Sequence, residues 1–91
     1  MMSDRIQAIR DRLETGLEPV SLDITDESHL HIGHPGAAGG AGHFSVRIVS
    51  PKFSGQSLLE RHRMVYAAVE DLMQTEIHAL SIKADTPEEE S

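Results

Sequence analysis

Histidine is the residue type in this sequence whose number and spacing best suit chemistry. Six histidines occur in 91 residues, and four of them fall between positions 29 and 43. His29 and His31 are two residues apart, so in an extended backbone they project to the same side, and His34 can turn back through Gly33. Imidazole binds zinc, copper, nickel or iron, so this spacing allows a metal site. A solvent-exposed side chain remains the simpler explanation for any single histidine of this loop.

The other two histidines, His62 and His78, fall in segments with regular periodicity. His62 lies on the apolar side of a predicted helix, where a histidine is usually part of the packing. His78 lies near the start of a predicted strand, and strand ends are where binding sites collect on mixed sheets. From the residues alone, packing and function are equally good interpretations of His78.

The composition excludes several classes of function. The chain contains no cysteine, which excludes disulfides, thiolate nucleophiles and metal sites made only of thiolates. Fifteen acidic residues against eight basic ones give a net charge of −7, which repels phosphate backbones and anionic membranes unless the basic residues cluster. No apolar run is long enough to span a bilayer, and the first residues lack the apolar region of a signal peptide. We therefore expect a soluble, cytoplasmic protein.

Known catalytic motifs are missing from the sequence. It contains no G-x-S-x-G, no H-E-x-x-H, no Walker loop and no G-x-G-x-x-G after a strand. The glycines between positions 33 and 42 do not open a helix, so they do not form a phosphate-binding turn. We expect that the protein is not an enzyme.

Two helices are expected among the elements that position these histidines. Apolar residues that recur every three to four positions predict a first helix before Pro19 and a longer one over residues 58–72. Ser57 and Glu60 form a capping box at the start of the longer helix. Leu58 belongs to its apolar face in this pattern. Any core must be built on this helix, because it is the longest periodic segment.

Alternating apolar residues predict three strands, over residues 20–25, 43–49 and 77–83. The glycine-rich loop between the first two strands favours an antiparallel hairpin. The longer helix joins the second and third strands as a right-handed crossover, so these two should be parallel. The expected fold class is α+β with the order α-β-β-α-β, a three-stranded mixed sheet and both helices on one face.

The third strand and the residues after it complete the predicted organisation. Alternation places His78, Leu80 and Ile82 on one face of the strand. Residues 1–84 are expected to form a single domain. Residues 85–91 are acidic, contain a proline and offer nothing to bury, so we predict a disordered tail.

Five short motifs, taken in order, resemble the BolA family over roughly residues 17–83. They are DES-x-x-H at 26–31, GHF at 42–44, F-x-G at 53–55, RHRMVY at 61–66 and IHALSI at 77–82. The resemblance implies an α-β-β-α-β fold similar to the class II KH domain. This is the same order of elements that the periodicity predicts independently.

The resemblance also implies a function and a set of ligands. BolA-like proteins pair with monothiol glutaredoxins and share a [2Fe-2S] cluster with them and with glutathione, in iron–sulfur cluster trafficking or iron regulation. The BolA-like partner supplies the histidine of its I/V-H-A-L strand, which matches His78, and a histidine or cysteine from the loop between the first two strands. The loop match is His31, with His34 as a competitor and His29 as a weaker one.

The chemistry of the chain agrees with such a half-site. Without cysteine the chain cannot hold an iron–sulfur cluster alone, because these clusters need thiolates on at least one iron. Two imidazoles on one iron and two thiolates on the other form a Rieske-like ligand set. The thiolates would then come from glutaredoxin and glutathione.

Two alternatives remain open. One is a KH-like transcription regulator that binds nucleic acid through Arg61, Arg63, Lys52 and Arg47. Class II KH domains grip nucleotides through a GXXG loop, whereas the corresponding segment here is FSGQS, and the net charge also opposes this function. The other alternative is metal storage or sensing by the histidine loop alone.

Overall fold

The computed structural model describes residues 5–27, 42–73 and 75–90 of the chain. Its elements in chain order are α1 (Arg5–Leu17), β1 (Ser21–Asp26), β2 (Gly42–Val49), η3 (Pro51–Phe53), α2 (Leu58–Ala68), η4 (Glu70–Leu72), β3 (Ile77–Asp85) and α3 (Pro87–Glu90). The predicted α-β-β-α-β order is confirmed. The short 3₁₀ turns η3 and η4 and the final turn α3 are additions to it.

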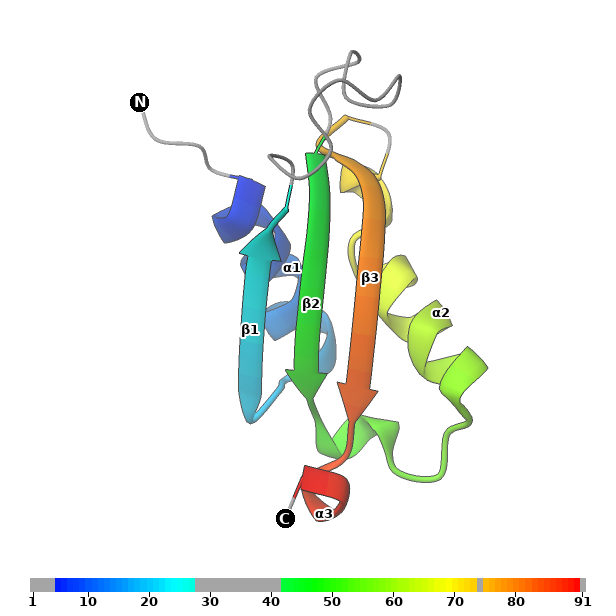
Figure 1. The fold of residues 1–91 in the computed structure, drawn as a ribbon. Coiled ribbons are helices and arrows are strands. Elements are labelled where there is room, and N and C mark those ends of the chain that lie inside the picture. The colour runs from blue at the N-terminus through cyan, green and yellow to red at the C-terminus, as the bar shows by residue number, and fades with distance from the viewer. Residues whose placement is uncertain (1–4, 28–41, 74, 91) are drawn as a thin grey trace.

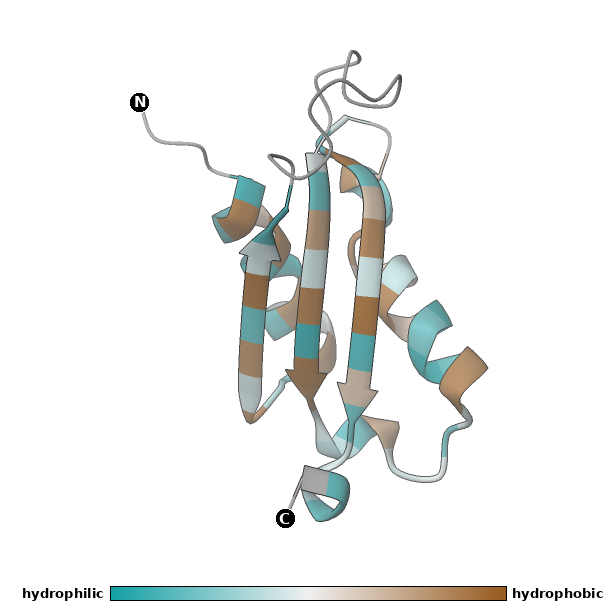
Figure 2. Ribbon diagram, viewed as in Figure 1, coloured by the Kyte–Doolittle hydropathy of each residue, from teal (hydrophilic) through white to brown (hydrophobic). Residues whose placement is uncertain are grey.

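The strands form one mixed sheet in the order β1-β2-β3. β1 pairs with β2 in an antiparallel manner, and β2 pairs with β3 in parallel, as the sequence predicts. Figure 1 shows α1 and α2 on the same side of this sheet. Brown and teal residues alternate along β1 and β2 in Figure 2, because one face of the sheet is covered by the helices and the other meets solvent.

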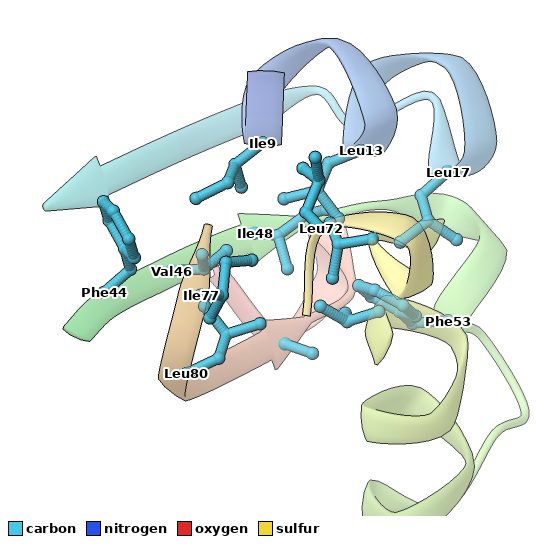
Figure 3. Close-up of a cluster of buried hydrophobic side chains, with 13 residues drawn as sticks. Ile9, Leu13, Leu17, Phe44, Val46, Ile48, Phe53, Leu72, Ile77 and Leu80 are labelled. Atoms are coloured by element: carbon cyan, nitrogen blue, oxygen red, sulfur yellow. The ribbon is translucent and has the colours of Figure 1, made fainter. Parts of the chain in front are cut away.

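The core lies between the helices and the sheet (Figure 3). It is aliphatic apart from two phenylalanines, and all of its members are at most 8% exposed. The buried residues are Ile9, Leu13, Leu17, Phe44, Val46, Ile48, Phe53, Val65, Val69, Leu72, Ile77, Leu80 and Ala84. Burial of these side chains stabilises the fold and holds the sheet in place against the helices.

The longer helix begins at Leu58 with the predicted Ser57 cap, but it ends earlier than predicted and its first turn is not buried. Its α-helical part ends at Ala68, and the chain continues into η4 as a 3₁₀ turn. The hydroxyl of Ser57 caps the first turn by accepting the N–H of Glu60, at 3.1 Å. Leu58 was expected on the buried face, but it is 69% exposed. The reason is that this first turn lies beyond the edge strand β3, where there is no sheet to cover it (Figure 1).

The acidic C-terminal segment also differs from its prediction of disorder. β3 runs through Asp85, and α3 begins after Thr86. Thr86 and Glu89 cap each other: the N–H of Thr86 donates to Oε1 of Glu89 at 2.9 Å, and the N–H of Glu89 donates to Oγ1 of Thr86 at 3.3 Å. Glu89 also binds Arg61 on α2. Order in this segment depends on that partner, which the local composition does not reveal.

Candidate metal centre

The parallel pairing of β2 and β3 brings the starts of the two strands to one edge of the sheet. Gly42 lies opposite Ile77, and His43 lies opposite Ala79. The N–H of Gly42 donates to the carbonyl of Glu76 at 3.1 Å, and this bond aligns the starts of the two strands. His43 and His78 therefore occupy the same end of the sheet, next to each other.

A register shift at this point points His78 away from the core. One step along β2, from Gly42 to His43, corresponds to two steps along β3, from Ile77 to Ala79, so His78 is the extra residue of a β-bulge. Ile77 and Leu80 are both buried in the core, at 1% and 8% exposure, while His78 is exposed. The prediction that His78 shares a face with Leu80 was wrong, because the bulge interrupts the alternation.

The side chains of His43 and His78 meet at this edge. Their ring centroids are 4.9 Å apart, and the ring planes are tilted by 48°. His43 is half-buried, and its carbonyl accepts the N–H of Glu27 at 2.8 Å, which ties the start of β2 to the end of β1. The arrangement presents two neighbouring imidazoles at one end of the sheet.

His43 was not among the ligands predicted from the sequence, although the sequence contained a signal for it. Both His43 and His78 fall at the start of a predicted strand, and these two strands were expected to be parallel. The starts of adjacent parallel strands lie at the same edge of a sheet. That relation alone places His43 near His78.

The loop histidines cannot be compared in this way. His31 and His34, the predicted second ligands, and His29 lie outside the described residues. His62 is half-buried on α2, consistent with the packing role expected for it.

The two imidazoles lie close enough together for both to bind one metal ion. With a metal–nitrogen distance of about 2.0–2.1 Å, two imidazoles on one tetrahedral ion have ring centroids roughly 5 Å apart. The observed separation of 4.9 Å permits such a shared ion, and it is also an ordinary spacing of two packed rings. Over residues 5–27, 42–73 and 75–90 there is no group of three or more His, Cys, Asp or Glu side chains that could hold a metal ion.

A profile of the BolA-like protein family matches residues 13–89. This chain belongs to the BolA-like family.

Curated BolA-like relatives agree with this assignment. SufE-like protein 1 of Arabidopsis thaliana is 44% identical over 97% of this chain, which spans 25% of that relative. Protein BOLA1 of the same plant is 43% identical over 97% of this chain, which spans 57% of that relative. The DNA-binding transcriptional regulator BolA of Escherichia coli is 37% identical over 91% of this chain and 76% of the relative.

Solved structures show the same BolA-like fold. The BolA domain of SufE1 from Arabidopsis thaliana matches with a TM-score of 0.84 and 43% identity, over 98% of this chain and 99% of that domain. The names of the two Arabidopsis relatives place them in the chloroplast or the mitochondrion, so a cytoplasmic location for this chain stays a prediction. Within the described residues, no helix has the length and apolar character needed to cross a membrane.

The first of the basic residues predicted for nucleic-acid binding, Arg61, is bonded within this BolA-like chain, unlike the exposed His78. Arg61 is 7% exposed and donates to the carbonyls of Gln56 and Ala84, both at 3.0 Å. It also donates to both carboxylate oxygens of Glu89, at 2.7 and 3.0 Å. These bonds to Arg61, and then the N–H of Thr86, lower the pKa of the Glu89 carboxyl from 4.5 to about 2.

The other three basic residues lie on the surface. Lys52 forms an ion pair with Glu18 at 3.3 Å, and Arg63 forms one with Glu60 at 3.1 Å. Arg47 is exposed on β2, directly across the sheet from Asp23. Each of these cations thus lies beside a carboxylate of the same chain, which weakens the local field available to a phosphate.

Proposed function

We propose that this protein is a non-enzymatic partner of a monothiol glutaredoxin and shares a glutathione-dependent [2Fe-2S] cluster with it. The observation that carries the proposal is the contact between His43 and His78, whose ring centroids are 4.9 Å apart at one end of the sheet. Membership of the BolA-like family supports the choice of partner. The role would lie in cluster trafficking or in the regulation of iron.

His78 is the ligand with the strongest support. The bulge turns it out of the core, and its exposure leaves the imidazole accessible to a partner. The second ligand is one of the loop histidines, His31 or His34, or else His43, whose ring already lies beside His78. When bound, the cluster would supply electron transfer or a transferable iron–sulfur unit, and the chain itself would supply neutral imidazoles in a fixed relation.

The absence of cysteine determines what the partner must contribute. An iron–sulfur cluster needs thiolates on at least one iron, and this chain has none to offer. A glutaredoxin cysteine and the glutathione thiolate would complete the ligand set. The protein would therefore hold the cluster only as half of a heterodimer.

The proposal is tested by reconstitution. The protein is mixed with a monothiol glutaredoxin, iron, sulfide and glutathione, and the visible absorption and circular dichroism spectra are recorded. We expect a heterodimer whose cluster spectrum differs from that of the glutaredoxin homodimer. A spectrum identical to that of the homodimer, with no heterodimer on size-exclusion chromatography, would refute the proposal.

Histidine variants identify the ligands. Replacing His78 by Ala should change the heterodimer spectrum, and an unchanged spectrum removes His78 as a ligand. His31→Ala, His34→Ala, His29→Ala and His43→Ala, made in turn, locate the second ligand. His62→Ala is the matched control, because it removes an imidazole from α2 and should leave the spectrum unchanged.

Nucleic-acid binding remains the second candidate function. The Escherichia coli relative is named a DNA-binding transcriptional regulator, which favours this function. The ion pairs of Arg61, Arg63 and Lys52 count against it, because a carboxylate of the chain beside each cation weakens its attraction for a phosphate. A sequence-specific shift of labelled DNA by the pure protein at physiological salt would support this function over the first.

A further inference from the structure

Glu76, the residue directly before β3, is bonded to three different parts of the chain. Its N–H donates to the carbonyl of Leu72 in η4 at 2.9 Å, and its carbonyl accepts the N–H of Gly42 on β2 at 3.1 Å. Its carboxylate oxygen Oε1 accepts Nε of Arg5 on α1 at 3.1 Å. Glu76 therefore connects α1, β2 and η4 at the point where β3 begins.

These contacts lie directly beside the two histidines. His43 follows Gly42 in the sequence, and His78 lies two residues after Glu76. The bulge that turns His78 outward falls between these bonded residues and the regular part of the β2–β3 ladder. A bulge leaves its extra residue outside the ladder, so its shape depends on what holds the chain on either side.

We propose that the Arg5–Glu76 ion pair is a positioning pair for the histidine site. By joining the start of β3 to the first turn of α1, it holds the bulge in the form that keeps His78 beside His43. The two side chains are 31% and 39% exposed, so the pair is partly shielded from water, which strengthens it relative to a fully exposed pair. The inference deepens the proposed function, because the residues held in place are those that would bind the cluster.

A second ion pair of α1 provides a matched control. Nε and Nη2 of Arg12 donate to the carboxylate of Asp71 in η4, at distances from 2.8 to 3.2 Å. This pair also joins α1 to the segment before β3, but it is more exposed, at 44% and 57%. Asp71 lies in η4, away from the bulge, whereas Glu76 directly precedes β3 and its bulge. If α1 docking alone mattered, the two pairs would be equivalent.

The experiment uses the chain alone, without iron or glutaredoxin. Nuclear Overhauser cross-peaks between the ring protons of His43 and His78 report their separation directly. They are compared in Arg5→Ala, Glu76→Ala, Arg12→Ala and Asp71→Ala, with the urea midpoint of each variant as a measure of stability. We expect the cross-peaks to be lost in the first two variants and retained in the last two, with similar small shifts of the urea midpoint in all four.

Other outcomes overturn the proposal. Retention of the cross-peaks in Glu76→Ala means that the bulge holds His78 without the pair. Equal loss in Asp71→Ala means that docking of α1 is the cause. The double variant Arg5→Glu/Glu76→Arg rebuilds the pair with its charges exchanged and should restore the cross-peaks; failure to do so also counts against the pair. Because no cluster is present, these results are independent of whether a glutaredoxin complex forms.

Discussion

The two ends of the parallel β2–β3 pair use polar residues in opposite ways. At the C-terminal end of the strands, the guanidinium of Arg61 is buried and donates to Gln56, Ala84 and Glu89 within the chain. At the N-terminal end, the bulge turns His78 out of the core and leaves it exposed beside His43. At the C-terminal end the guanidinium is hydrogen-bonded within the chain, and at the N-terminal end an imidazole is exposed to solvent.

This difference distinguishes residues that stabilise the fold from residues that are available for a function. A buried charged group that is fully bonded within the chain contributes to the fold, because removal of one partner leaves the others without compensation. An exposed side chain held at a bulge contributes little to stability, so its orientation is open to a functional use. Arg61 of the basic RHR segment is a buried residue that contributes to the fold. His78 of the IHAL segment is an exposed residue whose orientation is open to a functional use.

The largest expected effect is that of Arg61→Met. The substitution keeps much of the side-chain volume but removes every hydrogen bond to Gln56, Ala84 and Glu89. We expect the greatest loss of thermal stability among these variants, because the Ala84 carbonyl and the Glu89 carboxylate lose their bonds to the guanidinium at once. Thermal unfolding followed by circular dichroism measures it.

Arg63→Met is the control for Arg61→Met. Arg63 lies two positions along the same helix, but it is exposed and, among the described residues, its ion pair is with Glu60, so we expect a change within about 0.5 kcal/mol. The ring cross-peaks between His43 and His78 should persist in both variants below their melting temperatures. Equal effects of the two substitutions would show that Arg61 does not hold this end of the sheet.

A smaller effect is expected for Ser50→Ala at the same end. Ser50 is fully buried, and its hydroxyl donates to the carbonyl of Leu17 at 2.6 Å and accepts the N–H of Lys52 at 3.1 Å. Loss of the hydroxyl leaves a buried carbonyl without this donor, which costs about 1–3 kcal/mol. Urea unfolding measures the loss, and Ser54→Ala, at an exposed position, is the control. An unchanged midpoint would mean that water replaces the hydroxyl.

The pairing of Glu89 predicts how stability depends on acid. The folded protein holds the pKa of this carboxyl at about 2, below its ordinary value of 4.5. A depressed pKa contributes stability that is fully present above pH 4.5 and is lost as the pH falls from 4.5 toward about 2. We expect wild type to exceed Glu89→Gln in urea midpoint at neutral pH and the difference to shrink across this window. A difference that is independent of pH would exclude this linkage; Glu70→Gln serves as the control.

Local patterns were sufficient to predict most of the fold. Period-two alternation located the strands, and the Ser57 cap located the start of α2. The crossover rule then made β2 and β3 parallel. These features depend on neighbouring residues and on the order of the elements along the chain, and both can be read from a single sequence.

The site itself was only partly predictable. In IHALSI, alternation from Leu80 backward assigns His78 to the core face, whereas Ile77 is the better core residue, and only the three-dimensional packing decides between them through a bulge. The order of the acidic C-terminal segment was missed for a related reason. It depends on an ion pair between Glu89 and Arg61, 28 residues apart, and local composition carries no trace of such a partner.

The smallest expected effect on stability is that of His78→Ala. His78 is exposed and lies outside the regular ladder, so its removal should change the free energy of unfolding by no more than about 0.5 kcal/mol. His43→Ala is the companion variant and should cost more, because His43 is half-buried within β2. Urea unfolding of both variants tests the order. A loss above about 1 kcal/mol for His78→Ala would mean that packing holds its imidazole. The distinction between a structural and a functional end of the sheet would then fail, because a side chain required by the fold is not free to give up its contacts and bind a metal.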